Sequence, residues 1–321
     1  MHDTCRILVT GSNGFVGEAL FKYLQEVEQY HVSGSVRVAD VASENLFTVS
    51  ELSEKTDWFD ALKGQHVVVH VAARAHVMDD FVGEPLAEYR RVNVDGTLNL
   101  ARQAASAGVR RFIFISSIKV NGESTIIGSP FQHLDKAMPK DPYGISKAEA
   151  EAGLWQINKE SGMEIVIIRP PLVYGPGVKA NFASMMKLVS KNYPLPLGAV
   201  RNRRSMVALD NLINLISTCI NHPKAANQTF LVSDDQDAST TELLRIMAHA
   251  FGKKAKLIPI PMSWIRGVAT LLGKKVVADR LCGSLQVDIT HTKNTLGWRP
   301  PVTMEQQLAK IAASMSSPRD V

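Results

Sequence analysis

The segment Thr10–Gly17 constrains this chain more than any other, because Gly11, Gly14 and Gly17 stand between an apolar strand and a helix. Residues 6–10 predict a short buried strand, and the residues after the turn predict an amphipathic helix. Such a turn leaves backbone N–H groups and the positive end of the helix dipole free, and glycine lets a ligand approach the backbone. The pattern G-x-x-G-x-x-G in this setting is typical of a loop that holds the diphosphate of a dinucleotide.

The alternation of strand and helix continues along the first half of the chain. Continuous apolar strands joined by helices indicate parallel β-α-β units with both faces of the sheet covered. The predicted fold class is therefore α/β, a Rossmann-type doubly wound parallel sheet. The expected strands are 6–10, 32–37, 47–49, 66–72, 112–116 and 164–168, and the expected helices include 58–62, 84–107 and 143–160.

The second half of the chain is richer in proline than the first half. Most of the 15 prolines fall from residue 170 onward and divide this part into short pieces. A length of 321 residues is enough for about two domains. We expect residues 1–169 to form the dinucleotide-binding domain. Residues 170–321 are expected to form mainly a smaller C-terminal substrate lobe that could return strands to the sheet.

Composition excludes several classes of protein. The net charge of +5 is small and scattered, so it indicates no nucleic-acid partner, although it suits a small anionic ligand. The three cysteines match no metal spacing, and no metal site is expected. The chain shows no signal peptide and no stretch of about 18 apolar residues, which predicts a cytoplasmic protein without stable membrane insertion. Residues 261–275 predict a basic amphipathic helix that packs on the lobe, with membrane-surface association as the alternative.

The end of the second strand distinguishes between two dinucleotides. An acidic side chain there would bind the ribose 2′-hydroxyl of NAD, whereas an arginine can pair with the 2′-phosphate of NADP. Val36 occupies the aligned position and Arg37 follows it, which favours NADP(H) as the cofactor. Asp40, three residues further on, keeps NAD(H) open as the alternative.

Two further motifs indicate proton chemistry at the same edge of the sheet. Tyr143 and Lys147 form the pattern Y-x-x-x-K at the start of a predicted helix, where residues four apart share one face. A nearby lysine charge lowers the pKa of a tyrosine, which suits acid–base work on an alcohol or ketone oxygen. Ser116 and Ser117 end the fifth strand at the carboxyl edge of the sheet, where ligands of such folds bind. Ser117 is therefore placed to hydrogen-bond the same oxygen.

Together with the run Arg169–Pro176, these motifs resemble the extended short-chain dehydrogenase/reductases, and within them the nucleotide-sugar epimerase/dehydratase group. The resemblance spans nearly the whole chain. It implies an NAD(P)-dependent enzyme with Ser117, Tyr143 and Lys147 as catalytic residues. A non-catalytic dinucleotide-binding sensor is the distant alternative, which the presence of all three residues disfavours.

The resemblance also implies which residues hold the ligands. Substrate binding is expected at Ser117, Lys119, Arg203 or Arg204, and more weakly at Arg280, because a guanidinium binds the diphosphate of a UDP-sugar with two parallel hydrogen bonds. The expected cofactor-binding residues are Gly11, Asn13, Gly14, Phe15, Val16, Gly17, Arg37, Glu51, Leu52, Ala72, Ala73, Arg74, Asn93, Ser116, Tyr143, Lys147 and Pro170.

Departures from the group's pattern narrow the expected reaction. Dehydratases carry Asp-Glu after the catalytic Ser or Thr and epimerases usually carry two small residues, whereas Ile118 and Lys119 follow Ser117 here. With Arg37, this favours an NADPH-dependent reductase acting on the C4 ketone of a UDP-4-keto-6-deoxy-N-acetylhexosamine. The chain resembles the bacterial 4-ketoreductases that make UDP-N-acetylquinovosamine. The alternative is an NAD-dependent UDP-sugar 4-epimerase, which uses the same three catalytic residues.

The resemblance further implies a homodimer. Long helices are predicted near 86–107 and 143–160, and these match the helices that form a four-helix dimer interface in the group.

Overall fold

The computed structural model describes residues 4–38, 45–75, 84–271, 273 and 275–316. Seven parallel strands form its main sheet, in the order β3-β2-β1-β4-β5-β6-β9. The first six places follow the doubly wound order of a Rossmann fold, which confirms the predicted fold class. The strands are β1 (Cys5–Thr10), β2 (Tyr30–Val36), β3 (Leu46–Thr48), β4 (Val67–His70), β5 (Arg111–Ile115), β6 (Glu164–Arg169) and β9 (Gln228–Leu231).

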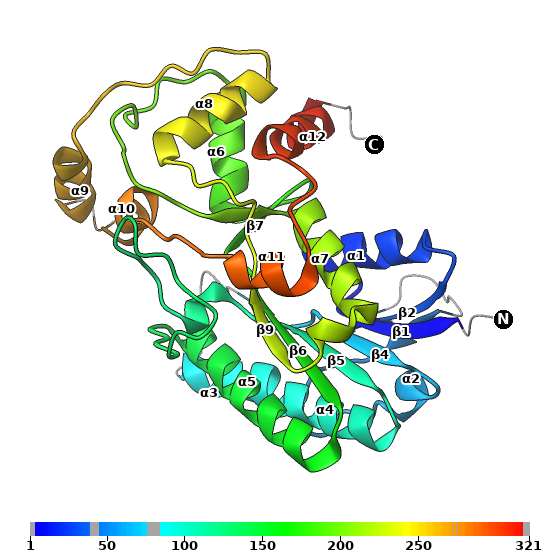
Figure 1. Cartoon of the computed structure of the whole chain (residues 1–321). Helices are drawn as coiled ribbons and strands as arrows, with labels where there is room; N and C mark the ends of the chain where they lie inside the picture. Colours follow the sequence, from blue (N-terminus) through cyan, green and yellow to red (C-terminus); the bar gives the residue numbers. More distant parts are fainter. Residues whose placement is uncertain (1–3, 39–44, 76–83, 272, 274, 317–321) are drawn as a thin grey trace.

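Helices cover both faces of this sheet (Figure 1). Alternate residues of each strand enter opposite cores: Ile7 and Val9 face one core, and Leu8 faces the other. One core is closed by α1 (Phe15–Gln25), α7 (Leu209–Asn221) and α11 (Thr290–Leu296). The other is closed by α2 (Phe59–Leu62), α4 (Gly96–Ser106) and α5 (Pro142–Ser161).

The expected long helix over 84–107 is three pieces in the structure. It begins as α3 (Pro85–Arg90), passes through a π-helical stretch, η1 (Arg91–Asp95), and continues as α4. A π-helical turn holds one more residue than an α-helical turn and is frequent at functional sites. Asn93, one of the expected site residues, lies in this stretch.

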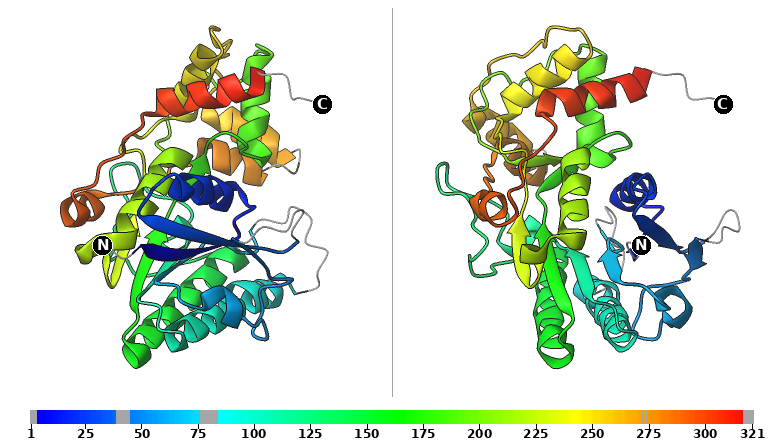
Figure 2. Two further views of the ribbon diagram at one scale, coloured as in Figure 1. Left: turned by 90° about the vertical axis from the view of Figure 1, so that its right-hand side faces the viewer. Right: turned by 45° about the vertical axis from the view of Figure 1, so that its right-hand side comes forward.

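A smaller lobe stands above the carboxyl edge of the sheet (Figures 1 and 2). Its own core gathers apolar side chains such as Tyr174, Phe182, Met247 and Leu308. Strands β7 (Leu172–Tyr174) and β8 (Met206–Ala208) pair in parallel, and the lobe's helices are α6 (Ala180–Ser190), α8 (Thr240–Ala250), α9 (Met262–Leu271), α10 (Lys275–Cys282) and α12 (Met304–Ser316). Two 3₁₀ turns, η2 (Ile118–Val120) and η3 (Pro223–Ala225), complete the elements described.

The chain crosses between the two parts more than once. Strand β9 follows the lobe's first elements yet pairs with β6 at the edge of the main sheet. A second part that returns a strand to the sheet was one of the arrangements expected from sequence, while the division at residue 169 stays a prediction. Within the described part of the chain, every helix is too short or too polar to span a bilayer.

Candidate active site

The turn after β1 is built for close approach of a ligand to the backbone. Gly11 adopts a left-handed conformation, with φ of +67°. A Cβ atom on Gly17 would lie 2.0 Å from the carbonyl oxygen of Gly11, so no side chain fits there. Helix α1 begins directly after Gly14 and has no side-chain cap. Its first N–H groups are therefore available to an anionic group, and the turn fits the diphosphate of a dinucleotide.

The other expected cofactor residues of this half lie at the ends of neighbouring strands. Asn13 is exposed in the turn, and Phe15 and Val16 are half-buried at the start of α1. Arg37 follows β2 directly and is exposed, whereas Asp40, the alternative, lies outside the described residues. Beyond β3, a shallow cavity of about 220 Å³ is lined by residues 48–51 and 55–57. Glu51, an expected cofactor-binding residue, therefore borders an open space next to the end of β3.

Buried polar side chains fix the loop that follows β4, which carries Ala72, Ala73 and Arg74. The Thr10 hydroxyl lies 2.7 Å from Nδ1 of the fully buried His70 and accepts a hydrogen bond from the Ala72 N–H. The side chain of Asn93 accepts from the Arg74 N–H at 2.8 Å and donates to the Arg74 carbonyl at 3.1 Å and to the Ser146 hydroxyl at 3.0 Å. Asn93 thus braces the loop against α5, and its polar atoms are directed at protein partners.

Tyr143 and Lys147 lie on the first turns of α5, and the residues around them fix the lysine. The Lys147 ammonium donates to the Ile115 carbonyl at 2.8 Å and lies 4.3 Å from the centroid of the Phe114 ring. It is 5.9 Å from the centroid of the Tyr143 ring, so the two side chains face one space, as the spacing predicts. The ring of Tyr89 stands edge-on to Tyr143, with centroids 6.1 Å apart.

Burial controls the proton affinities of this pair. Burial lowers the pKa of Lys147 to about 7, although the Glu151 carboxylate, one turn further along α5, acts to raise it. Burial also raises the pKa of Tyr143, and the negative charge of Asp141 adds to that effect. The sequence-based expectation of a lowered tyrosine pKa therefore differs from this structure, where burial and the negative charge of Asp141 raise it.

Ser117 and Lys119 approach the start of α5 from the end of β5. The Ser117 hydroxyl accepts a hydrogen bond from the Lys119 N–H at 3.2 Å, and its own hydrogen can still be donated. The Lys119 ammonium forms an ion pair with Asp141, the capping residue of α5, and lies 6.0 Å from the centroid of the Tyr143 ring. Lys119 was expected to bind substrate; in this structure it secures Asp141 beside Tyr143.

A buried ionic network lies directly behind these residues, and the sequence analysis missed it. Glu151 accepts hydrogen bonds from the Ser116 hydroxyl at 2.5 Å and from two nitrogens of the Arg169 guanidinium at 2.9 and 2.5 Å. Arg169 also donates to Asn121 at 3.0 Å. The network ties together the ends of β5 and β6 and the helix that carries Tyr143. The signal in the sequence was the spacing, since Glu151 stands four residues after Lys147 on the same helical face.

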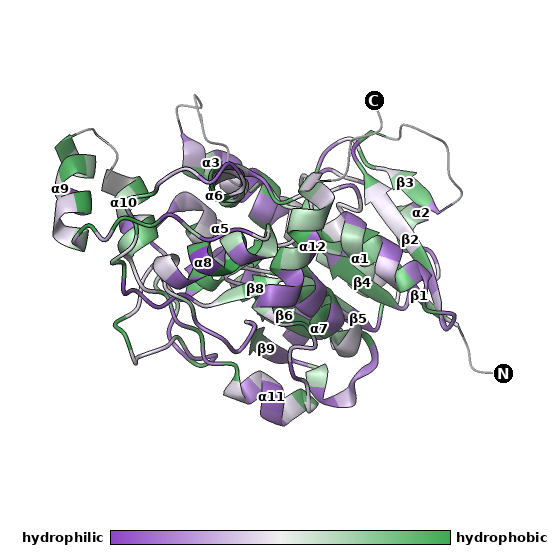
Figure 3. Cartoon of the chain, turned by 90° about the horizontal axis from the view of Figure 1, so that it is seen from above, coloured by the Kyte–Doolittle hydropathy of each residue, from purple (hydrophilic) through white to green (hydrophobic). Residues whose placement is uncertain are grey.

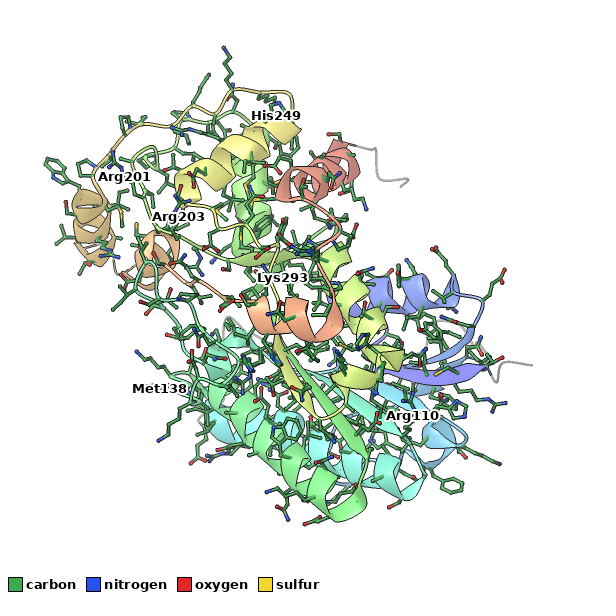
Figure 4. The ribbon with its side chains drawn as sticks, viewed as in Figure 1. Arg110, Met138, Arg201, Arg203, His249 and Lys293 are labelled. Atoms are coloured by element: carbon green, nitrogen blue, oxygen red, sulfur yellow. The ribbon has the colours of Figure 1, made fainter. Side chains whose placement is uncertain are left out.

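The expected substrate arginines lie in the smaller lobe. Arg203 is exposed and forms an ion pair with Glu242 at 3.4 Å (Figure 4). Arg204 bridges to two other segments through its backbone and donates from its guanidinium to the Gly283 carbonyl at 3.1 Å. The side chain of Arg280 lies outside the described residues. Pro170 is buried at the end of β6, where its carbonyl accepts from the Ile118 N–H at 2.9 Å.

The structure thus gathers the glycine turn, the loop after β4, Ser116, Ser117 and Pro170 at the carboxyl edge of one sheet. Tyr143 and Lys147 face the same region from α5. This arrangement can hold a dinucleotide along the strand ends and move a proton at a hydroxyl or carbonyl oxygen.

Comparison with known proteins supports this interpretation. Residues 7–233 match the model of the family described as the NAD dependent epimerase/dehydratase family. A UDP-glucose 4-epimerase of Vibrio cholerae is 54% identical over 308 residues, which cover 95% of this chain and 94% of that protein.

Solved structures share the fold at lower identity. The UDP-glucose 4-epimerase of Thermotoga maritima, solved with UDP-glucose, has a TM-score of 0.75 at 22% identity and covers 97% of this chain and 98% of its own. RMD from Pseudomonas aeruginosa, solved with NADPH, has a TM-score of 0.73 at 22% identity and covers 97% of this chain and 100% of its own. At these identities the two structures establish the fold alone.

Proposed function

This chain belongs to the NAD-dependent epimerase/dehydratase family and is an NAD(P)-dependent enzyme of the nucleotide-sugar group, and we propose that it is a UDP-sugar 4-epimerase with UDP-glucose as a substrate. The observation that carries the proposal is the 54% identity, over nearly the full length of both chains, to a UDP-glucose 4-epimerase. The sequence analysis preferred the C4 ketoreductase and kept the epimerase as its alternative. The comparisons favour that alternative.

The cofactor of the family is a nicotinamide dinucleotide, and we propose that this chain uses NAD. One observation and one consequence of the proposed reaction weaken the case for NADP that rested on Arg37. The side chain of Arg37 is exposed after β2, and an exposed arginine is a common surface charge. An epimerase also returns each hydride that it removes, so it has no need to exchange NADPH at every turnover.

The site residues have distinct tasks in the proposed reaction. The glycine turn and the loop after β4 would hold a nicotinamide dinucleotide, which would supply reversible hydride transfer at C4 of the sugar. Tyr143 takes the proton of the C4 hydroxyl and later gives it back. A positive charge on Lys147 acts against the burial that raises the pKa of Tyr143, and Glu151 acts against the burial that lowers the pKa of Lys147. Ser117 donates a hydrogen bond to the C4 oxygen and holds it beside the Tyr143 phenol.

The proposal is tested by interconversion of UDP-glucose and UDP-galactose. The purified enzyme should equilibrate the two without added reductant, and denaturation should release NAD. Tyr143→Phe should abolish turnover while NAD remains bound, and Arg37→Ala, the control, should keep both. Consumption of NADPH in proportion to a UDP-4-keto-6-deoxy sugar, with no interconversion, would instead establish the ketoreductase.

The homodimer stays a prediction. The two long helices expected to form it are α5 and the α3–α4 stretch, and within one chain they are joined by the ion pair of Arg90 with Glu149 at 2.6 Å. Analytical ultracentrifugation of the purified enzyme tests the dimer directly.

A further inference from the structure

Helix α9 lies at the outer edge of the smaller lobe (Figures 1 and 3) and carries apolar side chains that are exposed to solvent. Met262 and Ile265 pack inward against the lobe's core. Trp264, Val268 and Leu271 point outward and are 71%, 55% and 87% exposed. Their spacing of four and three residues places them on one side of the helix. A surface helix of a water-soluble domain ordinarily has one apolar face, whereas α9 has two.

Basic residues are concentrated in the stretch of chain that contains these exposed apolar side chains. The segment from Leu243 to Ala278 contains no aspartate or glutamate, and its seven lysines and arginines exceed the net charge of +5 of the whole chain. Three of these basic side chains, Lys253, Lys254 and Lys256, are exposed on the loop before α9. Arg266 is exposed on α9 itself, where it forms an ion pair with Asp279 of α10 at 3.9 Å. The loop before α9 runs from the end of α8 over the top of the lobe to α9 (Figure 1).

We propose that α9 and the basic loop before it dock this enzyme onto an anionic phospholipid surface. An amphipathic helix with tryptophan and leucine on one side and lysine and arginine nearby is the chemistry that binds the boundary between headgroups and acyl chains. Clustered lysines add attraction to anionic lipids. The helix has 10 residues, which is too short to span the hydrocarbon core, so it lies in the plane of the surface.

Charge argues against a second copy of the chain as the partner. Two identical copies of this surface would bring basic side chains against basic side chains, and like charges across an interface oppose association. An anionic bilayer meets the same charges with complementary ones and offers an apolar layer to Trp264 and Leu271.

The proposal is independent of the catalytic assignment, because none of these residues belongs to the candidate active site. Full-length enzyme is mixed with vesicles of phosphatidylglycerol and phosphatidylcholine, or of phosphatidylcholine alone, and floated on a density gradient. We expect flotation with the anionic vesicles at low ionic strength, its loss at high ionic strength, and a blue shift of tryptophan emission that Trp264→Phe removes.

Matched variants distinguish binding through α9 and its preceding loop from nonspecific adsorption to vesicles. Leu271→Ser should reduce binding, whereas Leu134→Ser, at a leucine 84% exposed elsewhere, should not. The triple variant Lys253→Glu, Lys254→Glu and Lys256→Glu should weaken binding by about 100-fold or more. The control variant Lys63→Glu with Lys159→Glu, at two exposed lysines elsewhere, should leave binding unchanged. Every variant should keep the wild-type rate with a soluble UDP-sugar.

Two results would overturn the proposal. One is the absence of flotation with anionic vesicles at low ionic strength. The other is a protein that does not bind vesicles but self-associates, with Leu271→Ser abolishing the self-association. That result would show that a second copy of the chain covers α9.

Discussion

Replacement of Glu151 by alanine should destabilise this protein severely, because it leaves a buried arginine without its anionic partner. The side chains of Glu151 and Arg169 are 5% and 9% exposed. The carboxylate accepts two hydrogen bonds from Arg169 and one from Ser116. After the substitution, Arg169 keeps Asn121 as its remaining neutral partner in this network, and the Ser116 hydroxyl loses its acceptor.

The expected magnitude follows from the geometry of this network. Removal of one partner from a buried ion pair costs about 3–5 kcal/mol, because the remaining charge is stranded away from water. The stranded Ser116 hydroxyl adds about 1–3 kcal/mol. A domain is stable by only about 5–15 kcal/mol, so Glu151→Ala should bring the protein close to unfolding. Glu151→Gln keeps the shape and an acceptor oxygen, and should cost about 2 kcal/mol.

Urea unfolding followed by circular dichroism measures these differences. The decisive comparison is the double variant Glu151→Leu with Arg169→Met, in which no charge is left buried and the volume is nearly kept. It should be more stable than Glu151→Ala alone. A cost below about 1 kcal/mol for Glu151→Ala would refute the assignment of this pair as a coupled buried network. So would a double variant whose loss of stability equals the summed losses of Glu151→Leu and Arg169→Met measured separately.

Three further predictions concern the cofactor loop and pH. Gly17→Ala should abolish dinucleotide binding measured by calorimetry, because its Cβ would lie 2.0 Å from the Gly11 carbonyl oxygen, whereas Gly267→Ala, which meets open space, should bind normally. Burial lowers the pKa of Lys147 from 10.5 to about 7, so the unfolded chain binds more protons between these values; the cofactor-free protein should gain thermal stability as pH rises from 7 to 10.5, and Lys147→Met should remove that gain. Burial also lowers the pKa of His70 from 6.5 to about 3, so stability should fall as pH drops below 6.5, and His70→Gln should flatten this dependence in urea titrations.

Local patterns in the sequence were sufficient for the first half of the fold. The strand, glycine turn and helix at the start of the chain follow from residues that are neighbours in sequence, and the structure places them as expected. The strands at 112–116 and 164–168 were visible for the same reason, because each is a continuous apolar run buried on both faces. The spacing of Tyr143 and Lys147 likewise fixed their common helical face.

Short segments whose role depends on distant partners were not visible in this way. Strand β9 has four residues, and no local pattern shows that they pair with β6, which lies some 60 positions earlier in the chain. The π-helical stretch at Arg91–Asp95 interrupts a segment whose sequence predicts one continuous helix. Whether such a segment folds differently is decided by the side chains that it meets across the molecule.

The residues of the candidate site also fall into those predictable from local sequence and those that depend on tertiary contacts. The sequence by itself determined the glycine turn, the serine at the end of β5 and the tyrosine–lysine pair, because backbone sterics and helical periodicity act over a few residues. Only the tertiary structure decided that Lys119 pairs with Asp141, that Asn93 braces the loop after β4, and that Glu151 meets Arg169. These contacts join segments that the chain brings together only when the sheet forms, and burial there sets the proton affinities of the site.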